Sequence, residues 1–354
     1  MRRIAIINQK GGVGKTTSCV NLGAALARTG ARVVVIDMDP QANLTLHLGQ
    51  ELEAGEPSTY TVLTGATPLG DALRPTRTPG LSLLPSHIDL SGAELELASA
   101  IGRERLLGDA LDEWERAETE AHGQAPADYV LVDCPPSLGL LSINGLAACG
   151  ELLLVLQTEF FALQGLSKLV DVVQVLQRRL CPELKITGIL PCLYDSRLRL
   201  AREVLGEIRR YFPEQVFSTC IRTNVKLAEA PSHGSTIFEY DPSSTGAKDY
   251  LRAAQELAAQ PPAQRPLPAV AELERRVAQL SRDSSSQVRA TDLAAVEIPR
   301  GRPTQPAQPV PGQAPKSAPG PSSNLNYGHA SGEDRAHLAG KNGPAGGPTP
   351  WPSA

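Results

Sequence analysis

The stretch with the clearest chemistry is NQKGGVGKTT, residues 8–17, which directly follows the first hydrophobic run of the chain. Its glycines, Gly11, Gly12 and Gly14, allow the backbone to turn sharply and to point N–H groups at phosphate oxygens. A helix predicted to begin near Lys15 would present its positive end to the same anion. The spacing therefore predicts a phosphate-binding loop between a strand and a helix.

The side chains of this loop have separate predicted tasks. Lys15 would place its ammonium group on the β- and γ-phosphates of a nucleotide, and the Thr16 hydroxyl would ligate Mg²⁺. Lys10 is a second lysine, which an ordinary phosphate loop does not need, and taken alone it could equally be a solvated surface side chain. The predicted nucleotide-binding residues of the loop are Lys10, Gly11, Gly12, Val13, Gly14, Lys15, Thr16 and Thr17.

Carboxylates follow two further hydrophobic runs. Asp37 and Asp39 end the run VVVIDMD and would share one face if that strand persists, while Asp133 ends the run YVLVD. The C-terminal ends of strands are where α/β sheets bind ligands, although Asp37 could instead cap the next segment. The sequence offers no better general base than these carboxylates, which favours slow turnover that depends on positioning.

The elements that must position these groups alternate along the chain. Short β-rich runs, several of them apolar on both faces, are separated by longer helical patterns. The pattern predicts an α/β fold with a mostly parallel, twisted sheet of about seven to eight strands and helices on both faces. Strands are expected at 3–9, 32–39, 81–86, 129–135, 151–158, 185–192, 216–221 and 236–240, and helices at 15–29, 91–120, 163–180, 197–212 and 246–260.

Composition divides the chain of 354 residues at about residue 260. Residues 1–260 carry a formal net charge of −7, so any nucleic-acid binding must come from a local basic patch. Residues 261–354 carry +3 and hold 16 of the 30 prolines. We expect one folded domain over 1–260 and a largely disordered tail, with a possible short helix near 270–282.

Cysteine usage and hydropathy indicate the compartment. No two cysteines form a C-x-x-C pair, which argues against a zinc site or a disulfide framework and favours buried small side chains in a reducing compartment. No stretch approaches the 18 or more apolar residues of a membrane span, so we expect a cytoplasmic protein without a membrane partner. The cysteines are Cys19, Cys134, Cys149, Cys181, Cys192 and Cys220.

Several blocks together resemble one family. KGGVGKT is similar to the deviant phosphate loop (deviant Walker A) of the ParA/MinD family of ATPases. The blocks VIDMDPQANLT, VLVDCPPSLG, QTEFFALQGL and NVKLAEAPSHG resemble its chromosome- and plasmid-partition branch, the ParA/Soj proteins. The matches run from residue 1 to about 255. The resemblance implies a P-loop NTPase fold and an ATPase that uses ATP and Mg²⁺ as cofactors.

The resemblance also implies roles for the charged residues. Lys10 would reach the nucleotide of the partner subunit in a homodimer and act in catalysis together with Lys15 and Asp39. Asp39 would orient the attacking water. The Mg²⁺ site would be formed by Thr16, Asp37 and Asp133, with Asp37 closer to the metal shell than Asp39 and Asp133 holding the ion through water.

Adenine and DNA contacts follow from the same resemblance. Asn224 matches the position that hydrogen-bonds adenine, but the sequence RTN departs from the family's Pro-Arg-Asn, with Arg222 in place of the proline. Non-specific DNA binding would use the basic segment 196–212 and the region of Lys226, although a solvated helix face with internal ion pairs is the alternative. The predicted DNA-binding residues are Arg197, Arg199, Arg202, Arg222 and Lys226.

The function implied is ATP-dependent DNA segregation. An ATP-bound sandwich dimer would bind double-stranded DNA on the nucleoid and release it after hydrolysis stimulated by a ParB-like partner. The alternative is a MinD-like membrane ATPase, which carries a C-terminal amphipathic helix with bulky apolar residues, unlike the ending GGPTPWPSA. An iron–sulfur carrier on the same fold is less consistent, because Cys134 lies beside Asp133 at a strand end.

Overall fold

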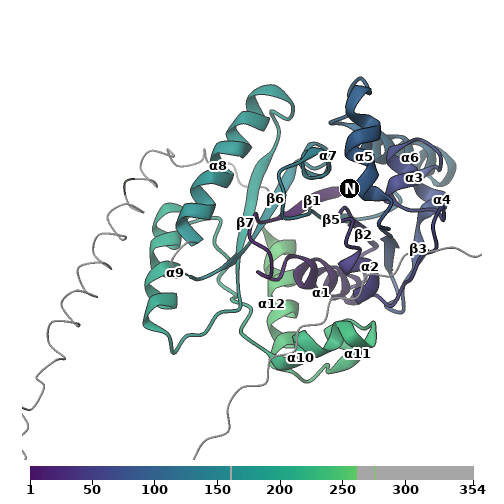
Figure 1. Cartoon of the computed structure of the whole chain (residues 1–354). Coiled ribbons are helices and arrows are strands. Elements are labelled where there is room, and N and C mark those ends of the chain that lie inside the picture. Colours follow the sequence, from purple (N-terminus) through teal and green to yellow (C-terminus); the bar gives the residue numbers. More distant parts are fainter. Residues whose placement is uncertain (160–161, 261–274, 276–354) are drawn as a thin grey trace, which may run out of the picture. The chain divides into compact units, whose positions relative to one another are not determined.

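The computed structural model describes residues 1–159, 162–260 and 275, and the predicted helix near 270–282 lies almost wholly outside this part (Figure 1). Seven strands form one sheet in the order β3-β4-β2-β5-β1-β6-β7. All neighbouring strands are parallel except the edge pair β3 and β4. The strands are β1 (Arg2–Ile7), β2 (Val33–Asp37), β3 (Arg74–Pro75), β4 (Leu81–Leu84), β5 (Tyr129–Asp133), β6 (Glu151–Gln157) and β7 (Lys185–Cys192).

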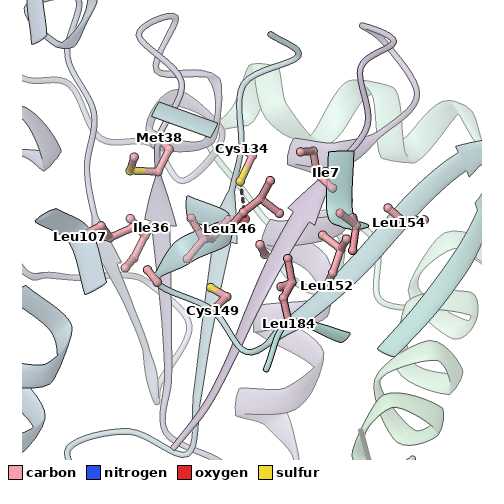
Figure 2. Close-up of a cluster of buried hydrophobic side chains, with 14 of the residues drawn as sticks. Ile7, Ile36, Met38, Leu107, Cys134, Leu146, Cys149, Leu152, Leu154 and Leu184 are labelled. Carbon is pink, nitrogen blue, oxygen red and sulfur yellow. Dashed lines mark hydrogen bonds between the residues drawn. The ribbon is translucent and has the colours of Figure 1, made fainter. Parts of the chain in front are cut away.

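Helices cover both faces of this sheet, as the apolar strands require (Figure 1). Side chains alternate along β1, so Ile4 and Ile6 pack into one apolar cluster and Ala5 and Ile7 into the other. Figure 2 shows part of the second cluster, where Ile7 and Leu152 come from neighbouring strands. The helices that pack on the first cluster are α1 (Lys15–Arg28), α2 (Asn43–His47), α10 (Val225–Glu229), α11 (Ile237–Tyr240) and α12 (Thr245–Ala259).

The opposite face carries the second cluster. Its helices are α3 (Thr59–Leu63), α4 (Leu69–Ala72), α5 (Leu90–Glu96), α6 (Leu106–His122), α7 (Leu140–Ala147), α8 (Ala162–Arg179) and α9 (Arg199–Tyr211). Two short 3₁₀ helices, η1 (Leu97–Ser99) and η2 (Ala230–His233), complete the order of elements in the described chain. Among these described residues, no helix is long and apolar enough to cross a membrane.

The last helix returns to the beginning of the chain. The hydroxyls of Ser18 on α1 and Tyr250 on α12 lie 3.1 Å apart in the core. Arg2 donates from Nη1 to the carbonyl of Leu257 across 2.9 Å. Helix α12 therefore closes the packing around α1, the helix that follows the phosphate loop.

Some predicted elements differ from the structure. The predicted strand at 236–240 is wrong, because Thr236 and Glu239 form a capping box that begins the short helix α11. The segment 216–221 forms only isolated bridges, and the helix expected over 91–120 is divided into α5, η1 and α6. Strand β2 ends at Asp37, so Asp39 lies beyond it and does not share a strand face with Asp37.

Candidate active site

The phosphate loop joins β1 to α1 at the C-terminal end of the sheet. Gly12 has φ of +74° and Gly14 has φ of +94°, a left-handed backbone that side chains with a Cβ rarely adopt. Gly14 is the N-cap of α1, which directs the first N–H groups of that helix toward an anion. The loop borders a cavity of about 460 Å³ that is also lined by Lys15, Thr16, Thr17, Asp39, Gln41, Asn43, His47, Pro136 and Pro231.

Lys15 is the buried cation of this cavity, with 8% of its surface exposed. Its ammonium group donates to the carbonyl oxygen of Lys10 across 3.3 Å. Burial lowers the pKa of Lys15, and the charges of Asp133 and Asp39 oppose that shift only in part. An anion in the cavity would therefore stabilise the ammonium form by replacing lost hydration.

Asp133 ends β5, the central strand of the sheet, and contacts Thr16 in the first turn of α1. The register of the sheet places it beside Asp37 on the neighbouring strand β2. Its Oδ2 accepts a 2.7 Å hydrogen bond from the Thr16 hydroxyl, and its Oδ1 is buried with no partner among the described residues. Burial, followed by the nearby charge of Asp37, raises the pKa of Asp133 to about 8.

Asp37 has its carboxylate fully satisfied within the chain. Its Oδ1 accepts from the Asp39 backbone N–H at 3.1 Å, and its Oδ2 accepts from the backbone and hydroxyl of Thr45 at 2.9 and 2.7 Å. Burial raises its pKa to about 6 despite these bonds. Asp37 therefore fixes the segment that carries Asp39 and α2. No motif in the sequence indicates that Thr45 binds Asp37.

The oxygen donors fit a magnesium ion that a nucleotide helps to hold. Mg²⁺ takes one or two protein oxygens and completes its shell with phosphates and water. The Thr16 hydroxyl and the unpartnered Oδ1 of Asp133 supply such oxygens. In residues 1–159 and 162–260, no group of three or more His, Cys, Asp or Glu side chains is placed to hold a metal without such help.

Asp39 lines the same cavity and is only half-buried. Its Oδ1 accepts from the Gln41 backbone N–H at 3.0 Å, and its Oδ2 has no partner in the described part of the chain. This geometry leaves one carboxylate oxygen available to a group inside the cavity.

Lys10 is the one predicted loop cation that turns away from this cavity. Its ammonium group is exposed and contacts Glu159 and the side-chain oxygen of Gln157, the latter at 3.3 Å. These two residues lie at the C-terminal end of β6, on the side of the loop away from the cavity-lining residues. In a single subunit, Lys10 thus does not join Lys15 at the phosphate position.

Residues 1–186 match the family described as "AAA domain". The sporulation initiation inhibitor protein Soj of Bacillus subtilis is 44% identical over 256 residues, which cover 72% of this chain and 98% of that protein. The chromosome partitioning protein ParA of Caulobacter vibrioides is 42% identical over 257 residues, covering 73% and 94%. This chain belongs to the Soj/ParA family of chromosome-partitioning ATPases.

Solved structures place the Soj/ParA chain among nucleotide-binding proteins of the same fold. A cobyrinic acid a,c-diamide synthase of Mycobacterium smegmatis with bound ADP and magnesium is 35% identical, with a TM-score of 0.62 over 75% of this chain and all of that one. The septum site-determining protein MinD of Pyrococcus horikoshii with Mg-ADP is 26% identical, with a TM-score of 0.58 over 73% and 96%. The predicted fold class is therefore confirmed.

A smaller cavity of about 140 Å³ adjoins the phosphate loop of this Soj/ParA chain and is lined by Gly12, Asn224 and Arg222 among others. Asn224 caps α10, accepting from the backbone of Lys226 and Leu227, and donates to the Thr245 hydroxyl across 2.6 Å. A base contact by Asn224 would have to replace or extend that last bond. The prediction for adenine therefore has a suitable location and stays a prediction.

The predicted DNA-binding residues are exposed or half-exposed, and most are paired with nearby carboxylates. Arg197 contacts Asp195 at 2.7 Å, and Arg199 contacts Glu203 at 2.7 Å. Lys226 contacts Glu229 at 2.8 Å. Arg202 donates to the carbonyls of Ser196 and Arg197.

Arg222 differs from these four residues. Its guanidinium group contacts Asp249 at 2.6 Å, and the Asp249 side chain is only 3% exposed. The arginine that replaces the family's proline is therefore paired with a buried carboxylate beside the smaller cavity.

The described cysteines are all free thiols, and all but the half-buried Cys220 are buried, as predicted.

Proposed function

We propose that this Soj/ParA protein is an ATP-driven switch for DNA segregation. Its cofactors are ATP and Mg²⁺, and it hydrolyses ATP to ADP and phosphate. In the proposal, an ATP-bound homodimer binds double-stranded DNA without sequence preference on the nucleoid and releases it after hydrolysis. A ParB-like centromere-binding protein would stimulate that step. The chromosome-partitioning names of the 44% and 42% identical relatives support this function.

The observation that carries the ATPase part is the unpartnered, buried Oδ1 of Asp133 beside Thr16, at the mouth of a glycine-rich anion loop. Thr16 and Asp133 would hold Mg²⁺, which supplies positive charge to the phosphates when it is bound. The loop N–H groups and Lys15 would bind the β- and γ-phosphates. Asp39 would orient the attacking water through its free Oδ2.

The dimer part rests on Lys10. Its contacts with Glu159 and Gln157 are exposed, and exposed ion pairs contribute only about 0–1 kcal/mol. A phosphate of a second subunit can therefore take the place of Glu159 at little cost. Lys10 would then act in trans on the partner's nucleotide, as an arginine finger does.

The DNA part rests on exposed cations at two places, α9 and α10, on an otherwise acidic body. Arg197 and Arg199 stand at the start of α9, and Lys226 stands on α10. The partners Glu203 and Glu229 are 56% and 39% exposed and Asp195 is 23% exposed, so water and DNA phosphates can compete for these cations. Two copies of a weak patch on one dimer gain affinity through effective concentration, without a new contact.

The test is DNA affinity and size-exclusion elution with ATP and with ADP, using wild type, Asp39→Ala and Lys10→Ala. We expect Asp39→Ala to remain an ATP-bound dimer on DNA, whereas Lys10→Ala should bind nucleotide but fail in dimer-dependent turnover. Equal DNA affinity with both nucleotides would contradict the switch. Binding of the ATP form to anionic lipid vesicles, without binding to DNA, would favour the MinD-like alternative.

A further inference from the structure

A groove of about 450 Å³ lies on the face of the sheet opposite α1, between the α3–α4 segment and α6. The α6 side chains that line it, from Ala110 to Glu118, recur at helical spacing on one face of that helix. Val62 and Leu69 supply apolar surface from the other wall. None of the phosphate-loop residues lines this groove.

Trp114 gives the groove an unused hydrogen-bond donor. The side chain is 9% exposed, and its indole N–H has no hydrogen-bond partner among the described residues. Gly70 lies next to the indole N–H of Trp114, since a Cβ at position 70 would lie 3.3 Å from Nε1. Because Nε1 is not among the buried unpartnered atoms of the described residues and Trp114 lines the groove, the N–H can donate to a carbonyl oxygen of a ligand that lies there.

Acidic side chains surround the apolar part. Asp71, Glu113 and Glu118 line the groove, and no lysine or arginine does so. Glu118 pairs with His122 at 3.1 Å, while Asp71 and Glu113 form no ion pair with a described residue. This rim repels nucleic acids and anionic lipids and attracts cationic groups.

We propose that this groove is a docking site for a basic peptide segment of a partner protein. A peptide offers the three features together: arginine or lysine for the acidic rim, an apolar side chain for Val62 and Leu69, and a backbone carbonyl for the Trp114 N–H. Helix α3, one wall of the groove, is also connected to β2, because it begins at Thr59, whose hydroxyl donates to the carbonyl of Asp37 across 2.8 Å.

Tryptophan fluorescence tests the site directly. Trp114 and Trp351 are the two tryptophans of the chain, so the full-length Trp351→Phe protein leaves Trp114 as the reporter. The probe is a short synthetic peptide of alternating arginine and leucine, with a glutamate–leucine peptide as its control. We expect a saturable change in Trp114 emission with the basic peptide alone, measured without nucleotide so that the phosphate site is not involved.

Matched variants separate the groove from general attraction to an acidic protein. Asp71→Lys/Glu113→Lys should weaken peptide binding about tenfold, because two attractive contacts become repulsive. Glu51→Lys/Glu120→Lys makes the same charge change at exposed positions outside the groove and should leave binding nearly unchanged. Gly70→Ala adds a methyl group at the indole N–H without changing charge and should also weaken binding.

Three results would overturn the proposal. The first is no saturable change with the basic peptide. The second is equal weakening in both charge-reversal variants, which would mean non-specific attraction. The third concerns acrylamide quenching of Trp114 fluorescence. Trp114 would be protected from acrylamide as well without the peptide as with it, and added salt would remove that protection. That result would assign the groove to this chain's own basic tail.

Discussion

The phosphate cavity and the basic surface of α9 and α10 hold their charges in opposite ways. At and beside the cavity, Lys15, Asp37 and Asp133 are buried, and strand register places Asp37 next to Asp133. On the basic surface, Arg197 and Lys226 are exposed and pair with carboxylates two or three residues away in the chain. Charges of the first kind are fixed by the fold, whereas charges of the second kind are held by local contacts that solvent or a ligand can replace.

This difference has an energetic meaning. Burial lowers the pKa of Lys15 and raises that of Asp133, so both charges are disfavoured in the empty protein and a bound ligand of opposite charge would stabilise them. Exposed pairs contribute little and weaken with salt. The cavity should therefore control chemistry and stability, and the basic surface should control salt-dependent association. The predictions below test this division, starting with the largest effect.

Lys15→Gln should reduce ATP hydrolysis at least about 100-fold, because it removes the buried positive charge from the phosphate position. The measurement is phosphate release at saturating Mg²⁺-ATP, together with nucleotide binding. Lys226→Gln is the control, since it removes an exposed lysine and should leave DNA-free hydrolysis unchanged. Equal losses in the two variants would remove the distinction between the regions.

His47 should make the nucleotide-free protein sensitive to acid. The side chain is 2% exposed, and burial lowers its pKa to about 4. The unfolded chain binds a proton there near pH 6.5 and the folded chain does not, so stability falls as the pH drops through this window. The loss between about pH 7 and pH 4 should reach about 3 kcal/mol.

Urea unfolding of wild type and His47→Gln across this pH range measures that contribution. Asp37 and Asp133 titrate in both proteins, so the difference between the two curves isolates His47. The variant should lose less stability on acidification than wild type does. Parallel curves would mean that His47 accepts a proton without unfolding and that burial does not control its charge.

Arg222→Ala tests whether Arg222 belongs with the buried charges. The change leaves the buried Asp249 carboxylate without its guanidinium partner and should cost about 2 kcal/mol of unfolding free energy. Arg199→Ala is the matched control, because its partner Glu203 is 56% exposed, and it should cost less than about 0.5 kcal/mol. Thermal and urea unfolding measure both losses of stability. Equal losses would mean that the Arg222 ion pair contributes no more than an exposed pair does.

Arg197→Ala should have almost no effect on stability but a specific effect on DNA binding. In a symmetric dimer it removes two phosphate contacts and should lower the log–log salt slope of DNA affinity by about two. The measurement is DNA affinity with ATP at several salt concentrations, and Arg222→Ala should leave the slope nearly unchanged. If Arg197→Ala and Lys226→Ala both keep the wild-type slope, DNA binds elsewhere on the protein.

The sequence predicted the cavity better than its surroundings. Two-sided apolar runs define β1, β2 and β5, and the residues at their C-terminal ends meet because parallel strands share one direction. The strand at 236–240 was wrong because the local capping box of Thr236 and Glu239 outweighed its β-branched and aromatic residues. The bonds from Thr45 to Asp37 come from a later helix, and composition carries no signal for such a contact.

Charge alone also could not sort the basic residues. Arg197 and Arg222 are both arginines near the C-terminal part of the domain, yet the partner of Arg197 is 23% exposed and that of Arg222 only 3%. The burial of Asp249 decides this, and it depends on how α12 packs. Sequence reasoning therefore found the candidates, and only the fold separated them.

The return of α12 to α1 bears on the order in which the protein can be made. The helix behind the phosphate loop leaves the ribosome early, but its partners Tyr250 and Leu257 are translated near the end of the domain. Until α12 has been translated, the apolar side of α1 that packs against it stays exposed, and it can bind chaperones or form non-native contacts. Residues 261–354 are translated afterwards, which gives α12 several seconds to close the domain while the chain is still attached to the ribosome.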